Sequence, residues 1–191
     1  MDFKNLELHI LSFLKENLSD KLLYHNLQHS IDVAYFTEFI GKKENCTSLE
    51  ITLLKTAALL HDSGFIKQYF HNEKYAIEFA RQLLPDFDYH TNEIEIISSI
   101  IASTEVKVTP TTHLQKILKD ADYYNFGLKQ YTTSAMALRE EMEFYGTSYS
   151  AVEWKNVQIK FLEKHQYYTQ AAISEWLETK KINLDKLKSS L

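Results

Sequence analysis

The stretch LLKTAALLHDSGF, Leu53 to Phe65, decides how this sequence can fold. Apolar residues recur at helical spacing through Leu54 and Ala58, and the next position on that stripe is His61. Asp62 follows directly, so a histidine and a carboxylate stand where the next core residue is expected. Burying such groups costs free energy unless something pairs with them. The stretch therefore predicts a buried helix end that needs a polar partner.

The rest of the sequence predicts an all-α protein, because no segment alternates like a strand and only four glycines and two prolines interrupt the helical pattern. The expected helices run over residues 3–17, 26–40, 47–62, 72–84, 91–104 and 112–124, and two or three long helices follow. Gly41 is expected to end the second helix, and the capping boxes TSLE and SAVE are expected to open helices at Thr47 and Ser150. We expect one helical-bundle domain over residues 1–191, with a motif core at about residues 23–127 and the helices of 128–191 packed on it.

Composition and charge narrow the classes of function. The formal charge of −5 argues against binding to a nucleic-acid duplex. No apolar run approaches the roughly 20 residues of a membrane span, which predicts no membrane association. The single cysteine, Cys46, and an N-terminus without a secretory signal favour a cytoplasmic location.

Polar residues recur at the apolar edges of three predicted helices. His29 continues the buried stripe of Val33 and Phe36, His61 and Asp62 end the next helix, and Asp122 follows Ala121 near the end of a third. A single histidine on an apolar face is usually a hydrogen-bonded core residue, and an acidic residue near a helix end is usually a cap. Together, however, two imidazoles and two carboxylates match the donor set of a divalent cation, which would satisfy all four side chains at once.

Three ordered motifs resemble those of a known family. They are YHNLQHSIDV at Tyr24–Val33, LLHDSG at Leu59–Gly64 and DADYYNFG at Asp120–Gly127. The sequence resembles the HD superfamily of metal-dependent phosphohydrolases, and its first motif is similar to the YHNxxH opening of the cyclic-nucleotide phosphodiesterases. The motifs are specific for the superfamily and say little about the substrate.

The resemblance implies a role for each matching residue. His29, His61, Asp62 and Asp122 match the metal ligands, and His25 matches the histidine that protonates the leaving oxygen in the phosphodiesterases. The metal would be Mn, Fe, Co, Ni, Zn or Mg, with one firm site and a second, weaker one through Asp62.

Three further residues are candidates for binding the substrate. FHNEKYA, at Phe70–Ala76, resembles the HE-containing segment of many HD proteins and suggests His71. Many HD proteins carry a histidine where this chain has Thr104, whose hydroxyl suits phosphate or water better than a metal. Lys107 is the nearest loop cation to Thr104 and could bind a phosphate, although surface solvation is the commoner role of such a residue.

These residues together predict hydrolysis of a phosphate mono- or diester, a nucleotide or cyclic nucleotide, by attack of a metal-bound water. Asp62 would accept the proton of that water, and His25 would protonate the leaving group. Two alternatives stay open. An HD-type di-iron oxygenase would need extra histidines, for which His71 and His90 are candidates, and Thr104 argues against it. A non-enzymatic module would bind a nucleotide or protein partner without turnover, and the complete ligand set argues against that.

Overall fold

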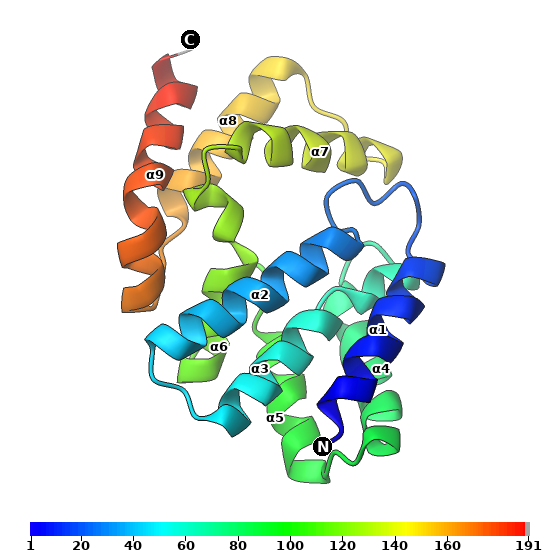
Figure 1. The fold of residues 1–191 in the computed structure, drawn as a ribbon. Helices are drawn as coiled ribbons and strands as arrows, with labels where there is room; N and C mark the ends of the chain where they lie inside the picture. The colour runs from blue at the N-terminus through cyan, green and yellow to red at the C-terminus, as the bar shows by residue number, and fades with distance from the viewer. Residues whose placement is uncertain (190–191) are drawn as a thin grey trace.

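The computed structural model describes residues 1–189, and every regular element in that range is helical (Figure 1). The α-helices are α1 (Phe3–Asn17), α2 (Leu27–Lys43), α3 (Ser48–Leu60), α4 (Asn72–Leu83), α5 (Thr91–Ala102), α6 (His113–Asp122), α7 (Tyr131–Phe144), α8 (Ala151–Lys164) and α9 (Gln170–Ser189). Three short 3-10 helices connect them: η1 (Ser63–Ile66), η2 (Leu84–Phe87) and η3 (Tyr124–Gly127). The all-α prediction is confirmed.

Helix α3 is the centre of the fold. It packs against α1, α2, α5 and α6, and its last residues from Leu53 to Leu60 are buried except Lys55. A helix that is apolar all round belongs in a core rather than at a surface. The end of α3 therefore delivers the residues that follow it into the interior of the bundle.

Of two helix ends predicted from the sequence, the structure confirms one and contradicts the other. The capping box at the start of α3 forms as expected, with Thr47 and Glu50 bonding each other's backbone N–H groups. The expected helix end at Gly41 is wrong, because α2 continues through it to Lys43 and the chain turns at Asn45 with φ of 60°. Gly41 lies at a close crossing of α2 and α3, where a Cβ would lie 2.5 Å from Cδ1 at the end of the Ile51 side chain.

Gly64 brings η1 against the start of α4. A Cβ at this position would lie 1.9 Å from the carbonyl oxygen of Asn72, a distance that no side chain can occupy. The glycine thus permits the close approach that folds the chain back immediately after Asp62.

The C-terminal helices cover one end of the bundle. In Figure 1, α7 and α8 lie across the top of the view and α9 runs along its left side. Helix α9 packs on η3, where a Cβ at Gly127 would lie 2.2 Å from the Trp176 side chain. The buried Asp120 accepts hydrogen bonds from the backbone N–H groups of Tyr168 and Thr169 and from the Thr169 hydroxyl, at 2.7 to 3.0 Å. These contacts join the last helix to the DADYYNFG motif.

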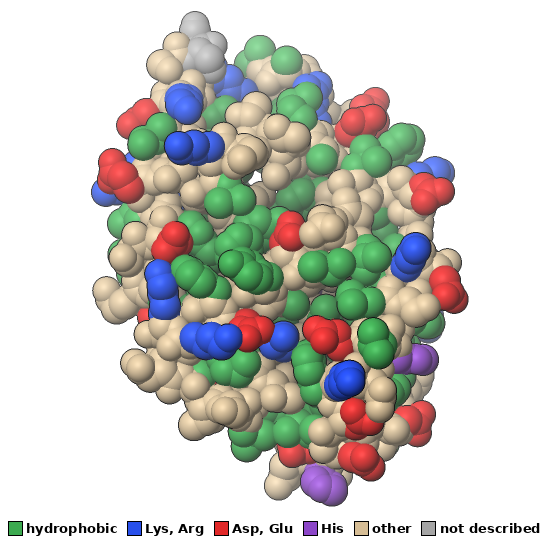
Figure 2. All heavy atoms as spheres, in the orientation of Figure 1, with side chains coloured by type: hydrophobic (Ala, Val, Ile, Leu, Met, Phe, Trp, Pro, Cys, Tyr) green, Lys and Arg blue, Asp and Glu red, His purple; other side chains and the backbone are tan. Residues whose placement is uncertain are grey.

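The surface charges and the helix lengths can be compared with what nucleic-acid or membrane partners require. Lysine, arginine and acidic side chains are interspersed on the face that Figure 2 shows, without an extended field of one sign. Among the described residues, none of the helices combines the length and hydropathy that crossing a membrane requires.

Candidate metal centre

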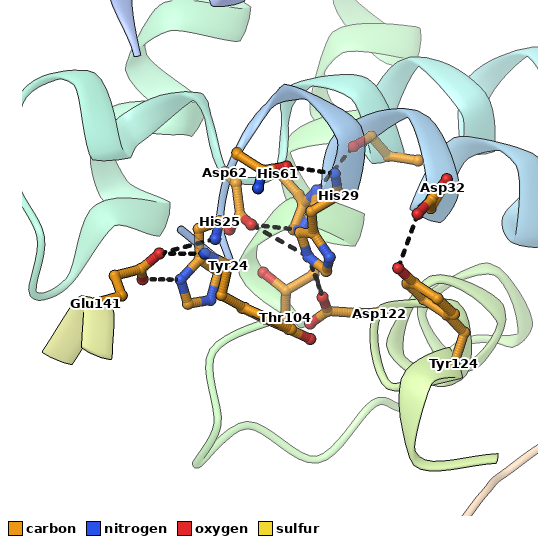
Figure 3. A network of polar contacts seen from close by, with 12 residues as sticks. Tyr24, His25, His29, Asp32, His61, Asp62, Thr104, Asp122, Tyr124 and Glu141 are labelled. Carbon is orange, nitrogen blue, oxygen red and sulfur yellow. Dashed lines mark hydrogen bonds and ion pairs between the residues drawn. The ribbon is translucent and has the colours of Figure 1, made fainter. Parts of the chain in front are cut away.

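The structure brings together the four residues predicted as metal ligands, from α2, the end of α3 and the end of α6 (Figure 3). Nε2 of His29 lies 3.4 Å from Oδ2 of Asp62 and 3.3 Å from Oδ1 of Asp122. Nε2 of His61 lies 3.0 Å and 3.4 Å from the same two oxygens. Single ligand atoms of His29, His61 and Asp122 all lie within 4.8 Å of one another, a spacing that one metal ion can bridge. Asp62 touches both imidazoles.

The donor atoms of this cluster are buried without hydrogen bonds and meet only one another. His29 and His61 are 4% and 1% exposed, and Nε2 of each, with Oδ2 of Asp62, makes no hydrogen bond within the described chain. These atoms face one another at ion-pair distance without hydrogen-bond geometry. Unsatisfied buried polar atoms are rare and cost about 1–3 kcal/mol each. Two imidazole nitrogens and carboxylate oxygens are suitable donors for a divalent transition metal, so the residues fit such an ion.

Helix α3 fixes the orientation of His61. Its Nδ1 lies 2.7 Å from the carbonyl oxygen of Ala58, to which the ring N–H donates. This bond places the proton on Nδ1 and leaves the lone pair of Nε2 directed at Asp62 and Asp122. The backbone of the helix end thus sets the tautomer that a metal ligand requires.

The carboxylates and imidazoles of the cluster shift one another's pKa values. Burial would raise the pKa of Asp62, but the His61 imidazole more than offsets this and lowers it below its ordinary value. The pKa of Asp122 is also lowered, since the nearby His29 and His61 rings outweigh its burial. Burial lowers the pKa of His61, yet the charge of Asp62 and contacts with Asp122 raise it overall. Because metal-bound imidazoles must be neutral, a cation would displace protons from this site.

His25 lies beside the cluster, just before α2, where Asn26 caps the helix. Its ring centroid is 5.7 Å from that of His29, and its Nδ1 lies 2.5 Å from Oε1 of Glu141 on α7. Burial would lower the pKa of His25, but the hydrogen bond with Glu141 and the surrounding carboxylates raise it. The side chain is positioned to hold a proton near the centre.

Glu141 is the functional candidate that sequence reasoning missed. Its side chain is fully buried and also accepts hydrogen bonds from the backbone N–H groups of Tyr24 and His25 and from the Tyr69 hydroxyl, at 2.8 to 3.0 Å. The available signal was its position three residues after Leu138, on the half-buried face of α7. A charged residue on an inward-facing stripe is the same signal that singled out His61.

A pocket of about 350 Å³ opens onto the centre. Of the predicted residues, His25, Asp62, Asp122 and Thr104 line it. His71 lies instead in a second, more open cavity and Lys107 is exposed, and neither lines this pocket. The Thr104 hydroxyl donates to the carbonyl of Ile101 at 2.8 Å, which leaves its lone pairs free.

Comparison with known proteins places the chain in a family. The model of the HD domain matches residues 26–127, more than half of the chain. The chain belongs to the HD domain family. HD domains bind divalent metals, and all four predicted ligands lie within the matched segment.

One relative and two solved structures are similar to this chain. An uncharacterized protein of Clostridium beijerinckii is 34% identical over 80 residues, which is 40% of this chain and 50% of the relative, so the match spans about half of that protein's length. The YpgQ protein of Bacillus subtilis, solved in complex with ADP, is 17% identical with a TM-score of 0.72, covering 99% of this chain and 95% of that one. A predicted HD superfamily hydrolase from an uncultured Thermotogales bacterium is 20% identical with a TM-score of 0.63, covering 96% and 92%. At these identities the solved structures show that the HD fold extends over nearly all of this chain.

Proposed function

We propose that this HD domain protein is a metal-dependent phosphohydrolase that hydrolyses a phosphate mono- or diester, a nucleotide or cyclic nucleotide. The observation that carries the proposal is the convergence of His29, His61, Asp62 and Asp122, with buried donor atoms that lack hydrogen-bond partners, at the base of a pocket. One metal ion would bind these four residues, and a second, weaker ion would share Asp62.

Each protein side chain then has a chemical task. When bound, the metal would lower the pKa of a coordinated water and draw charge from the phosphoryl oxygens. Asp62 lines the pocket and touches both imidazoles, so it is placed to accept the proton of the attacking water. His25 would donate a proton to the leaving oxygen, with Glu141 holding its ring and favouring its charged form. The Thr104 hydroxyl would donate to a phosphate oxygen by rotating away from the Ile101 carbonyl, or in its present orientation would accept a hydrogen bond from water.

The positions of two other histidines favour hydrolysis over an oxygenase with two irons. His71 and His90 do not line the pocket, and His90 caps the start of α5, whereas Thr104 follows its end. A helix of 12 residues spans about 18 Å, which separates His90 from the centre. His71 and Lys107 accordingly have no part in substrate binding in this proposal.

The nucleotide class is supported by two observations. A neighbour with the same fold, YpgQ, was solved with ADP bound. The pocket is large enough for a drug-sized ligand, by comparison with the 300–1,000 Å³ that such sites occupy. A small phosphorylated substrate, rather than a nucleic-acid duplex, agrees with the formal charge of −5.

The test combines metal analysis with a phosphoester panel. The purified chain with Mn²⁺ should release product from an aryl phosphate, a nucleotide or a cyclic nucleotide, and Asp62→Ala should lose both the metal and the activity. Asp20→Ala, which removes an exposed carboxylate, is the matched control and should retain both. Silence of the whole panel under several metals would contradict hydrolysis, and two tightly held irons with O₂ consumption would favour the oxygenase.

A further inference from the structure

The pocket extends well beyond the metal centre, to a wall built by the C-terminal helices. Helix α7 contributes Ala135, Leu138 and Met142, and α8 contributes Trp154, Val157 and Phe161. This wall is predominantly apolar, so it suits the organic part of a ligand rather than its phosphate. The two ends of the pocket therefore recognise different chemistry.

The charges around the pocket limit how many phosphates it can take. None of the described residues that line it is lysine or arginine, whereas three are carboxylates: Asp62, Glu73 and Asp122. The nearby buried cation, Lys119, donates through Nζ to the carbonyl oxygens of residues 103–105 and is thereby occupied. One phosphate carries a charge of about −1.5 to −2, which the metal centre can balance. A second or third phosphate would meet carboxylates with no lysine or arginine to balance it, and the His25 imidazole is already paired with Glu141.

The far wall contains polar atoms that lack partners in the protein. Trp154 is 4% exposed and its Nε1 donates to no described group, and Gln158 is 7% exposed with Oε1 unbonded. The amide of Gln158 donates through Nε2 to the backbone carbonyl of Trp154, at 3.5 Å, which assigns Oε1 as the free acceptor. Oδ1 of the buried Asn125 on η3 is also unbonded. Such atoms cost free energy in an empty protein, and all three residues line the pocket.

Aromatic side chains form the remaining surface of this region. Tyr123, Phe126 and Phe161 line the pocket and contact one another, with ring centroids 5.1 to 5.9 Å apart. Aromatic rings attract a planar ligand by offset stacking or edge contacts. A flat group with polar atoms on its edge fits both the rings and the unbonded donor and acceptors.

We propose that η3, α7 and α8 form a subsite for a planar nitrogen heterocycle with both a donor and an acceptor on its edge, carried by an ester with a single phosphate. The preferred substrate class is a nucleoside monophosphate or cyclic mononucleotide, and nucleoside di- and triphosphates are disfavoured. The heterocycle subsite stands on its own contacts, while the preference for one phosphate rests on the proposed function of the metal centre.

The first experiment measures binding without turnover. Adenosine, guanosine, cytidine and thymidine carry no phosphate, so the Mn²⁺-loaded chain can be titrated with them while its tryptophan fluorescence is recorded. Trp154 lines the pocket, whereas Trp176 is buried under Gly127 and is not part of its lining. At least one nucleoside should change the fluorescence, and Trp154→Phe should remove that change. Absence of a response to all four, checked by calorimetry, would overturn the subsite.

A matched pair of variants on α8 tests the hydrogen bonds. Gln158→Leu removes the free acceptor and should weaken nucleoside binding at least about tenfold, as expected for one lost hydrogen bond to a buried edge. Asn156→Leu changes an exposed amide on the same helix and should bind as the unchanged protein does. Equal affinities in the two variants, both shown to be folded by circular dichroism, would count against the assignment.

The phosphate preference is measured by kcat/KM. Nucleoside monophosphates should exceed the corresponding di- and triphosphates by at least tenfold, and the opposite order would overturn this part of the proposal. If nucleosides bind but no ester is hydrolysed, the proposed function fails and the subsite stands. If simple aryl phosphates are hydrolysed but nucleosides do not bind, the subsite fails and the proposed function stands.

Discussion

At the scale of single residues, the contact between Glu141 and His25 makes a prediction about pH. Glu141→Gln removes the carboxylate whose hydrogen bond raises the pKa of His25. A general acid works only while protonated, so its activity falls as the pH rises through its pKa. We expect the alkaline decline of kcat/KM to begin at a lower pH in the variant, with a loss of about 100-fold at its former optimum, as for an impaired proton donor. Full pH–rate profiles measure both effects.

Glu140→Gln provides the matched control, because this neighbouring carboxylate is exposed. Its profile should coincide with that of the unchanged protein. A uniform loss of activity in Glu141→Gln, with no displacement of the alkaline limb, would mean that Glu141 only supports the fold around Tyr24 and His25.

The same residue shows what the sequence could and could not predict about the site. His29, His61 and Asp122 stood out because each continues an apolar stripe near a helix end, and helical periodicity is a local property. Glu141 is 116 residues from His25, and its place on the stripe of Leu138 is a weak signal, because α7 is only half-buried and carries other glutamates that are solvated. Whether His71 and Lys107 reach the pocket likewise depends on how loops and helices pack, which spacing alone does not determine.

At the scale of elements, Gly64 makes a prediction about stability. Gly64→Ala would place a methyl group 1.9 Å from the Asn72 carbonyl, so η1 and α4 would have to separate. Overpacking of this kind costs about 1–3 kcal/mol, or more where backbone cannot move. At roughly 2–4 °C per kcal/mol for a chain of this size, Tm should decrease by several degrees in thermal unfolding.

Gly146→Ala is the informative comparison, since a Cβ there has no heavy atom within 4 Å but φ is +88°. Its cost is conformational, about 1–2 kcal/mol, and it should leave the metal centre intact. Gly64→Ala should also weaken metal binding, because η1 follows Asp62 directly. A Tm and a metal affinity both unchanged in Gly64→Ala would show that η1 can move at little cost.

The α-helices could be predicted from the sequence because the helical spacing of apolar residues persists over several turns. Each α-helix that the sequence indicated is present in the structure. The end of α2 was not, because Gly41 suits two different roles: a left-handed helix terminus and a close helix crossing. Only the position of Ile51, on another helix, decides between them. The 3-10 segments after α3 and α6 were also missed, since turns this short carry no periodic signal.

At the scale of the whole molecule, metal binding should stabilise the fold. The ligands come from three helices that pack on one another, and only the folded chain assembles them. A metal at about 100 times its Kd stabilises by about 2.7 kcal/mol, which corresponds to an increase in Tm of roughly 5–10 °C. Thermal unfolding of the chelator-treated chain, with and without Mn²⁺, measures this shift. Asp62→Ala should show no such shift, and an equal shift in that variant would place the ion elsewhere.

The hydrogen bonds of Asp120 link the segment matched by the family to residues outside it. The family match ends at residue 127, yet a buried carboxylate two residues before Asp122 draws its donors from Tyr168 and Thr169. A gene rearrangement that copied only the matched segment would carry this carboxylate without them, next to the metal centre. The surroundings of the metal centre therefore depend on residues some forty positions beyond the matched segment, just before α9.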